Sequence, residues 1–386
     1  MRIRLNNVAY ISLGLLGIYI SLFQSIISAV SQHFLLTSAV TGFIISLHFI
    51  GSLIAPLILG EVSDRAGKKM VVIISFCAFV FGLSLMCFFN NLSLFAVGVL
   101  VNGGAFAVGE GVLLGVLADN NLEQTNRVIN LSQIFFGVGA LIGPVYMLGI
   151  IGLTRNWKAN FLFLDILFGV ILLFIFKLHF RNDKVPKEES ASKNEGLISL
   201  KLLREKTFIF LSVALFIYVG IEDGVGFWLK TYLEKLFNPE QLGAYVLSGF
   251  WGGIILGRYI SSRFEKNYRL FLIMGLTFAL LISLCIGLTA QSISATSLLF
   301  IFLGLGFSVI APMIMLISTK CHPEYTGTVF GVLMAFAAAG GMVFPFLIGV
   351  AAEYIGIQKV FFLIPILILT VFLFLIPVLK RTAQSD

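Results

Sequence analysis

The chain has 386 residues, of which 59% are hydrophobic and only 12% are charged, and its mean hydropathy is +1.02. A soluble domain carries roughly 25% charged residues, so this composition excludes a soluble enzyme or nucleic-acid-binding protein, which needs a charged outer surface. Because the outer surface must face an apolar environment, the net charge of +7 has to be explained by where the charges lie in a membrane protein.

Twelve apolar segments are long enough to cross a bilayer as helices, which takes about 20 residues each. They cover 8–30, 38–60, 70–89, 93–117, 129–151 and 158–178, and then 207–229, 241–260, 269–289, 294–318, 325–350 and 356–379. The first segment follows Arg2 and Arg4 and has no small-residue cleavage site, so we interpret it as a retained helix and not as a signal peptide.

A single long polar stretch separates the two sets of six segments. We therefore predict an all-α membrane protein with twelve transmembrane helices in two six-helix pseudo-repeat halves. The N-terminal half covers 1–180, a connector covers 181–206 with a short interfacial helix around 197–205, and the C-terminal half covers 207–386.

Lys and Arg residues are distributed unevenly between the two sides of the predicted bundle. If the N-terminus is cytoplasmic, 21 of the 26 lie in cytoplasmic segments. The positive-inside rule then places both termini and the connector in the cytoplasm. The five that remain outside are Arg155, Lys158, Lys230, Lys235 and Lys359. Topology thus explains the basic net charge, and no nucleic-acid partner is required.

The two halves share short matches at offsets near 200 residues. The matched positions are Ile18-Tyr19 with Ile217-Tyr218, Phe135, Gly139 and Pro144 with Phe336, Gly340 and Pro345, and Leu59-Gly60 with Leu256-Gly257. Each match is weak alone, but their consistent offsets indicate parallel repeats of six helices, an architecture that occurs in one large class of transporters.

The segment 60–69 reads Gly-Glu-Val-Ser-Asp-Arg-Ala-Gly-Lys-Lys. It resembles the G-x-x-x-D-R-x-G-R-K signature of the major facilitator superfamily, with Lys68 in place of the usual Arg. The alternative is a positively charged turn with an incidental Asp. A carboxylate here could contact the N-terminus of the helix predicted over 325–350 and be stabilised by its dipole. In the family this contact latches the outward-open state, and the resemblance implies that role for Gly60, Asp64, Arg65 and Gly67.

Other motifs resemble the fucose-permease-type sugar:proton symporters, over most of both halves. They are Phe135 to Pro144 after Asn130, Tyr218 to Glu222 before Trp228, Gly304-Leu305-Gly306 before Pro312, and Ala339-Gly340-Gly341 before Pro345. Packing of helices is the other role that these glycines can have. Gly139-x-x-x-Gly143-Pro144 also half matches drug:proton antiporters, but Val145 and Tyr146 replace the following Gly-Gly, which favours uptake.

Four acidic residues fall well inside predicted helices, namely Glu110, Asp165, Glu222 and Asp223. No Lys or Arg lies near the middle of a predicted helix to pair with them. A charge at that depth costs at least about 2.5–3.5 kcal/mol, so an unpaired carboxyl keeps its proton until water reaches it. We therefore predict that Glu110, Glu222 and Asp223 are candidates for proton coupling, whereas Asp165 in a peripheral helix is structural.

In the major facilitator superfamily, helices 1, 4, 7 and 10 line the cavity. Fucose-permease relatives carry a functional Glu in helix 4, which Glu110 resembles by position. Their second coupling carboxylate lies in helix 1, where this chain has only Gln24, so the coupling mechanism stays open. For Glu110 and Glu222 the alternative is a protonated carboxyl bonded to a neighbouring helix. His48 could titrate near neutral pH, but we expect it to be a packed neutral side chain.

Uncharged polar and aromatic side chains in predicted helices 1, 4, 5, 7 and 8 are candidates for solute binding. Amides donate to and accept from hydroxyls, and aromatic faces pack against a sugar ring. The candidates are Gln24, Asn102, Asn130, Gln133, Tyr218, Trp228 and Trp251. Each of them could instead serve only in helix packing.

The sequence has no GxxxxGK[ST] motif, no HExxH motif, no cysteine cluster and no serine elbow, so neither ATP-driven transport nor catalysis is indicated. We expect a monomeric, multi-pass cell-membrane transporter without cofactor, which moves a small polar solute such as a sugar or polyol inward by proton symport. Three alternatives remain: proton-driven efflux of a drug-like or amphipathic compound, lipid or glycolipid translocation, and a membrane sensor that transports nothing.

Overall fold

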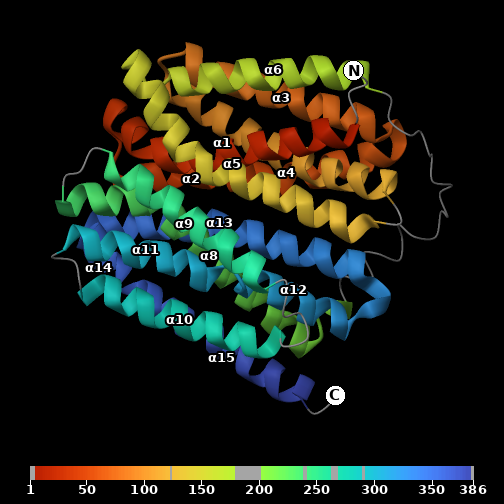
Figure 1. Cartoon of the computed structure of the whole chain (residues 1–386), viewed down its shortest axis with the longest axis vertical. Helices are drawn as coiled ribbons and strands as arrows, with labels where there is room; N and C mark the ends of the chain where they lie inside the picture. The colour runs from red at the N-terminus through yellow and green to blue at the C-terminus, as the bar shows by residue number, and fades with distance from the viewer. Residues whose placement is uncertain are drawn as a thin grey trace.

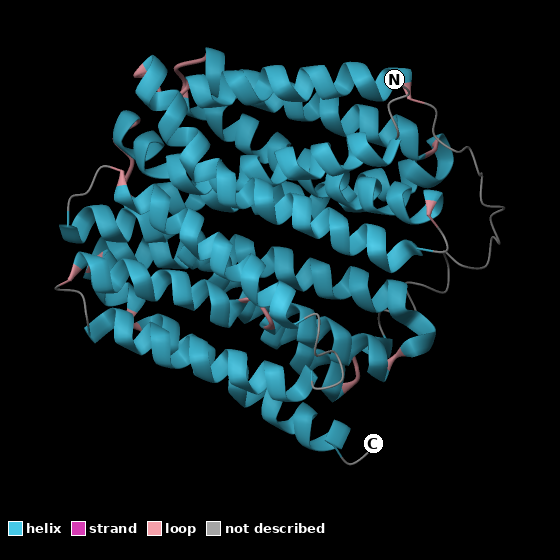
Figure 2. Ribbon diagram, viewed as in Figure 1, coloured by secondary structure: helices cyan, strands magenta, loops and turns pink. Residues whose placement is uncertain are grey.

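A computed structural model of the chain describes residues 5–121, 124–178, 201–237, 241–261, 268–288 and 292–383. These residues form helices joined by short turns, and no strand occurs among them (Figure 2). Most of the predicted connector, including 197–200 of its predicted interfacial helix, lies outside the described residues.

Six long helices precede the connector. They are α1 (Leu5–His33), α2 (Ser38–Ala66), α3 (Lys68–Phe88), α4 (Leu92–Asn120), α5 (Thr125–Thr154) and α6 (Ala159–Lys177). The helices after it are α8 (Lys206–Phe237), α9 (Leu242–Ser261), α10 (Tyr268–Leu288), α11 (Ile293–Phe307), α12 (Ile310–Cys321), α13 (Thr326–Ile355), α14 (Ile357–Phe361) and α15 (Leu363–Ala383). A 3-10 turn, Pro323–Tyr325, joins α12 to α13.

The helices run roughly side by side, and the two ends of the chain lie at the same end of the bundle (Figure 1). We call this the connector end and the opposite one the far end. The helices before the connector occupy the upper part of Figure 1 and those after it occupy the lower part. Which end faces the cytoplasm rests on the distribution of Lys and Arg in the sequence.

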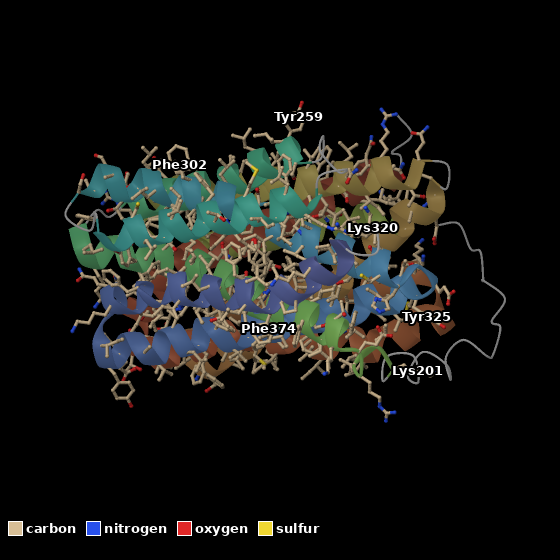
Figure 3. The ribbon with its side chains drawn as sticks, turned by 90° about the horizontal axis from the view of Figure 1, so that it is seen from below. Lys201, Tyr259, Phe302, Lys320, Tyr325 and Phe374 are labelled. Carbon is tan, nitrogen blue, oxygen red and sulfur yellow. The ribbon has the colours of Figure 1, made fainter. Side chains whose placement is uncertain are left out.

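Eleven helical segments of the described chain are long and apolar enough to cross a membrane, with α11–α12 and α14–α15 each counted as one. The twelfth segment, α9, holds five glycines and Arg258 and is not among the eleven. Large apolar side chains such as Phe302 stand exposed on the side of the bundle, whereas Lys201 lies near the connector end (Figure 3). The prediction of an all-α bundle with twelve spans is confirmed.

The two halves repeat one packing arrangement. In α5, a side chain on Gly139 would collide with the backbone carbonyl of Gly14 in α1. In α13, the matched residue Gly340 lies equally close to the backbone carbonyl of Phe216 in α8. These are the glycines that the sequence pairs at an offset of 201. Glycine at both positions lets two backbones approach closely, as transmembrane helices without a hydrophobic driving force require.

One predicted span, 294–318, is broken into α11 and α12. Pro312 explains the break, because a proline cannot donate a hydrogen bond to the carbonyl four residues earlier, here Ser308, and its ring clashes with that carbonyl. The chain turns at Ser308 and Val309 and then resumes as a helix. Broken helices near the centre of the membrane are frequent at the binding sites of transporters.

Two boundaries differ from the prediction in ways that matter for the site. The helix predicted over 207–229 continues to Phe237 as α8, since nothing before Pro239 interrupts it. The backbone of 60–66, expected as part of a turn, belongs to α2, which leaves Gly67 as the turn residue. Its φ of 87° is one that only glycine adopts without strain.

The close approach of α1 and α5 generates a stability prediction. Gly139→Ala should lower the free energy of unfolding by about 1–3 kcal/mol, because the added Cβ forces two backbones apart. Gly149→Ala in the same helix is the matched control, since a Cβ there has no neighbour within 4 Å. Thermal unfolding of both purified variants in detergent measures the effect. Equal midpoints would show that the close contact between α1 and α5 does not determine stability.

Candidate functional site

Carboxyl groups from both halves lie in the interior, and two of them, Glu110 and Glu222, lie near the same guanidinium. Glu110 lies on α4, and Glu222 and Asp223 lie on α8. Nη2 of Arg258, on α9, lies 4.0 Å from Oε1 of Glu222. The Glu222 side chain is only 12% exposed, whereas that of Arg258 is 35% exposed. A guanidinium therefore stands beside an almost buried carboxylate within the bundle.

Glu110 reaches the same cluster from the other half. The Gln133 side chain of α5 is within hydrogen-bonding reach of Glu110, and Arg258 is within its electrostatic range. Helix packing explains this: Gly137 of α5 contacts Ile255 of α9, and one turn further towards the connector end these helices carry Gln133 and Arg258. We call Glu110, Gln133, Tyr218, Glu222 and Arg258 the central cluster.

Tyr218 connects the central cluster to the break between α11 and α12. Its hydroxyl donates a hydrogen bond to the carbonyl oxygen of Phe307 at 2.6 Å, and it is within hydrogen-bonding reach of Glu222. The phenol is almost completely buried. A hydroxyl has one proton to donate, so Tyr218 can give it either to the broken helix or to Glu222.

The expectation that no basic residue pairs with the interior carboxyls is wrong for Glu222. The distribution of Lys and Arg in the sequence places Arg258 at the cytoplasmic end of its helix. Its backbone does lie one turn from the end of α9. Its long side chain reaches back into the bundle, however. Because α8 extends to Phe237, Glu222 lies at the middle of that helix and not towards its far end.

Gln24 and Trp251, both predicted to bind solute, meet across the two halves. The indole Nε1 of Trp251 on α9 donates to Oε1 of Gln24 on α1 at 2.9 Å. Gln24 also lies against Gly226 of α8. Asp223 points elsewhere, towards Gly341 of α13 and the ring of Phe49. Gln24 thus joins the two halves at a position between the central cluster and the far end of the bundle.

Three predicted solute ligands lie apart from the central cluster. Asn102 is completely buried against α3, where its amide nitrogen donates to the carbonyl oxygen of Phe79 at 2.9 Å and its amide oxygen accepts from the backbone N–H of Leu83. The indole of Trp228 donates to the carbonyl of Pro345 at 3.0 Å, so it joins α8 to α13. Asn130 is exposed near the connector end of α5. The structure does not bring these three together.

His48 and Asp165 have local partners within the first six helices. Nδ1 of His48 lies 3.4 Å from the Tyr19 hydroxyl, and the imidazole is buried among aromatic rings such as Phe49 and Phe106. Asp165 on α6 accepts a hydrogen bond from Ser84 of α3 at 2.8 Å. Both arrangements fit roles in packing these helices together.

Lys230 is a buried contact between the halves that the sequence does not predict, because the sequence indicates an external loop there. It lies in the extended part of α8 and is only 6% exposed. Its ammonium donates to the carbonyl of Ser25 and to the hydroxyl of Ser28 on α1, both at 2.8 Å. It also lies 3.3 Å from the carboxylate of Glu234, one helical turn away. That spacing of opposite charges on one helix face was the signal available in the sequence.

Hydrogen bonds between the halves gather at the far end and the middle of the bundle. Besides those of Trp251 and Lys230, Ser46 of α2 donates to the carbonyl of Met342 of α13 at 2.6 Å. The carboxylate of Glu353, near the end of α13, accepts from the backbone N–H of Ala39 in the first turn of α2 at 3.0 Å. A helix N-terminus favours such an anion. The described contacts therefore close the bundle at its far end.

Beyond the helical backbone, nothing is described at Gly60, Asp64 and Arg65, so the predicted contact of the Asp64 carboxylate with the start of α13 stays a prediction. Gly67 is described, and it supplies the turn that directs α3 away from α2. Within the described ranges, no group of three or more His, Cys, Asp or Glu residues could hold a metal ion.

Comparisons with known proteins agree with this architecture. A family profile described as Major Facilitator Superfamily matches residues 9–345. A putative glucose/galactose transporter of Helicobacter pylori (strain J99) is 25% identical over 323 residues, covering 77% of this chain and 76% of that protein.

Two solved structures are similar over nearly the whole chain. The nucleoside transporter NupG superimposes with a TM-score of 0.78 at 14% identity, covering 97% of this chain and 100% of that one. A variant of the E. coli fucose:proton symporter FucP gives a TM-score of 0.67 at 16% identity, covering 96% and 97%. At these identities the similarity concerns the fold alone. The glucose/galactose transporter among the sequence relatives confirms the resemblance to the fucose-permease branch, and the FucP structure agrees with it in fold.

Closure of the far end by Lys230 is testable. In a chain without its four native cysteines, a cysteine at the buried position Ser25 reports opening through labelling by a charged maleimide. Lys230→Met removes two charge-assisted hydrogen bonds, each worth about 1.5–3 kcal/mol, so labelling should accelerate about tenfold or more. Lys235→Met changes an exposed lysine of the same helix and is the control. An unchanged rate in the Lys230 variant would mean that Lys230 does not hold the halves together.

Proposed function

Because the chain belongs to the major facilitator superfamily, whose members are transporters and not enzymes, we propose that it carries a sugar or polyol into the cell by proton symport. The family makes it a multi-pass membrane transporter of a small molecule. The class of solute, the coupled proton and the inward direction are our proposal. In it the solute binds between the two halves, and access alternates between the two ends of the bundle.

The observation that carries the proposal is the central cluster. Carboxyl groups from both halves, Glu110 and Glu222, lie around a single guanidinium at the interface that must rearrange during alternating access. A carboxyl that gains a proton on one side and loses it on the other links solute flux to the proton gradient. Glu110 is the preferred coupling group because its position in helix 4 resembles that of the family's functional Glu.

The choice of a hydroxylated solute rests on the chemistry of the interior. Carboxylates, the amide of Gln133, the amide of Gln24 and the guanidinium of Arg258 accept from and donate to hydroxyl groups. Trp251 offers a ring face beside Gln24. The glucose/galactose assignment of the Helicobacter pylori relative supports the same class of solute.

The distribution of Lys and Arg supports an orientation in the cell membrane with the connector end and both termini in the cytoplasm. In that orientation the contacts of Lys230, Gln24 and Glu353 close the external end. In such a state the solute does not reach the site from outside the cell. We expect the protein to act as a monomer, with the lipid bilayer, the solute and protons as its partners and with no cofactor.

Transport of an amphipathic compound or a lipid is the second candidate. The ring of Phe227 on α8 packs against those of Phe23 and Phe49 from the other half, which gives the interface an aromatic portion suited to an apolar group. Proteoliposomes with an imposed pH gradient distinguish the candidates when they are supplied in turn with radiolabelled glucose and galactose, cationic dyes and fluorescent lipids. Accumulation of a sugar supports symport, whereas extrusion of a dye or lipid contradicts it.

Glu110→Gln tests proton coupling. The amide preserves shape and hydrogen bonding but cannot titrate, so it imitates a permanently protonated carboxyl. The variant should exchange sugar across the membrane at equal pH as the parent protein does. It should fail to accumulate sugar when the outside is acidic. Radiotracer exchange and gradient-driven uptake in the same proteoliposomes measure the two activities.

Glu222→Gln should lose accumulation if Glu222 is the coupling group, and should weaken sugar binding if it is a hydroxyl ligand. Normal gradient-driven accumulation by Glu110→Gln, by Glu222→Gln and by the double variant would rule out coupling through these carboxyls. A uniporter, or titration of Asp223 or His48, would then remain.

Asp64→Asn tests the latch. We propose that the Asp64 carboxylate binds the N-terminus of α13 in the outward-open state, and the contact of Glu353 with the first turn of α2 supports this reciprocal arrangement. Loss of the charge should move the population away from the outward-open state. Fewer far-end cysteines should then react with a charged maleimide.

Asp119→Asn removes an exposed carboxylate that pairs with Lys68 at the same end, and it serves as the control. Unchanged labelling in Asp64→Asn relative to the parent protein would refute the latch.

A further inference from the structure

A single guanidinium serves two carboxyl groups that belong to different halves. Arg258 lies 4.0 Å from Glu222 on its own side of the interface and within electrostatic range of Glu110 on the other. Its Nε is buried and makes no hydrogen bond to a described residue. The 4.0 Å separation from Glu222 is also longer than a hydrogen bond. Arg258 therefore keeps donors for a closer contact within the cluster.

We propose that Arg258 is a positioning residue of transport, which acts as the counter-ion of Glu222 and thereby leaves Glu110 as the carboxyl that carries the exchanged proton. The proposal deepens the proposed function and rests on it, since it assigns different roles to two carboxyls of the same site. Glu222 is then an ionised acceptor for solute hydroxyls, and Glu110 is the proton carrier.

The assignment follows from the net charge of Glu110, Glu222 and Arg258, which lie in the apolar interior of the bundle. A net charge buried in a bundle at bilayer depth is costly, so the stable forms of the cluster are neutral. Two carboxyls and one guanidinium are neutral when they hold one proton. Arg258 forms its ion pair with Glu222, so the proton belongs on Glu110, whose neighbour Gln133 is uncharged.

The side chains that face Arg258 from the helices packed against α9 do not change the net charge of the central cluster. Among the described residues, α11 carries no ionisable side chain, and α5 offers the uncharged Gln133 and, near its start, the exposed Arg127. From α8, Tyr218 is uncharged and donates to the Phe307 carbonyl. Asp223 interacts electrostatically with Glu222, but its carboxyl points towards Gly341 of α13 and no basic partner for it is described, so at this depth it keeps its proton and adds no charge. On α1 the near side chain is Gln24.

Arg258 is a positioning residue in a further sense, because it orients Glu222 relative to Tyr218. When Arg258 holds Glu222, the Tyr218 hydroxyl can bond the Phe307 carbonyl at the break between α11 and α12. Without Arg258, Glu222 needs a proton or a hydrogen bond from Tyr218. Removing the guanidinium should therefore disturb both the charge of the site and the helix break.

The test compares Arg258→Gln, Glu222→Gln and the double variant in proteoliposomes with radiolabelled glucose and galactose as probes. Arg258→Gln should raise the sugar concentration for half-maximal exchange at equal pH about tenfold, the effect of losing one charge-assisted interaction. It should also abolish accumulation driven by an acidic outside, because Glu222 now competes for the proton. The pH profile of exchange should change from one titrating group to two.

The double variant is the decisive comparison. When both members of the pair are neutral, Glu110 is the one carboxyl of the central cluster that can still titrate. Gradient-driven accumulation and a pH profile with one titrating group should therefore return, even though the affinity for sugar stays low. Arg258→Lys, which keeps the charge, should lie between the parent protein and Arg258→Gln. Arg127→Gln removes an exposed positive charge from α5 and should behave as the parent protein does.

Monodisperse elution and thermal unfolding identify variants that fail to fold, in which case Arg258→Lys and the double variant carry the comparison. Parental accumulation and pH profile in Arg258→Gln, or a double variant as inactive as Arg258→Gln, would overturn the counter-ion role. Failure of the proposed function looks different: the parent protein itself would exchange sugar without accumulating it, or would not accept sugar.

Discussion

The cost of burying charge governs this structure. At bilayer depth an unpaired ion costs several kilocalories per mole. In the described part of this bundle, the basic side chains of Lys230 and Arg258 lie close to carboxylates in the interior. Lys230 is satisfied by two oxygens of α1 and by Glu234, and Arg258 lies beside Glu222. Both arrangements place charge where the halves meet. Because two partners of Lys230, the carbonyl of Ser25 and the hydroxyl of Ser28, belong to the opposite half, moving the halves apart changes its electrostatic energy directly.

The contrast between packing within a half and contacts between halves explains how such a bundle can move. Inside each half, backbones touch at Gly139 and Gly340 in equivalent places, which makes each half rigid. Between the halves, the described hydrogen bonds gather at the far end and the middle, where a few side chains hold the closure. A rigid half that rotates on a small set of polar contacts is the physical basis of alternating access.

The fold was predictable from the sequence because bilayer thickness and composition leave few choices. Span positions, the repeat and the pairing of Gly139 with Gly340 followed from apolar runs and offsets. What the sequence did not reveal depends on side-chain reach and on helix continuation. From the sequence, Arg258 is predicted to lie at the cytoplasmic end of its helix, although its long side chain turns inward. Lys230 is predicted to be external because the predicted helix ends at residue 229, about two turns before the end of α8. Pro239 and the Lys230–Glu234 spacing could have corrected the second error, and Pro312 could have indicated the break before α12.

The central claim is that sugar and protons move together through the interface that holds Glu110, Glu222 and Arg258. The most direct measurement loads proteoliposomes containing the parent protein with a pH-sensitive dye and adds glucose or galactose outside with no imposed gradient. The account predicts that sugar entry acidifies the interior, that the acidification saturates with sugar concentration, and that an uncoupler prevents it. Sugar entry without any change of internal pH would contradict the account.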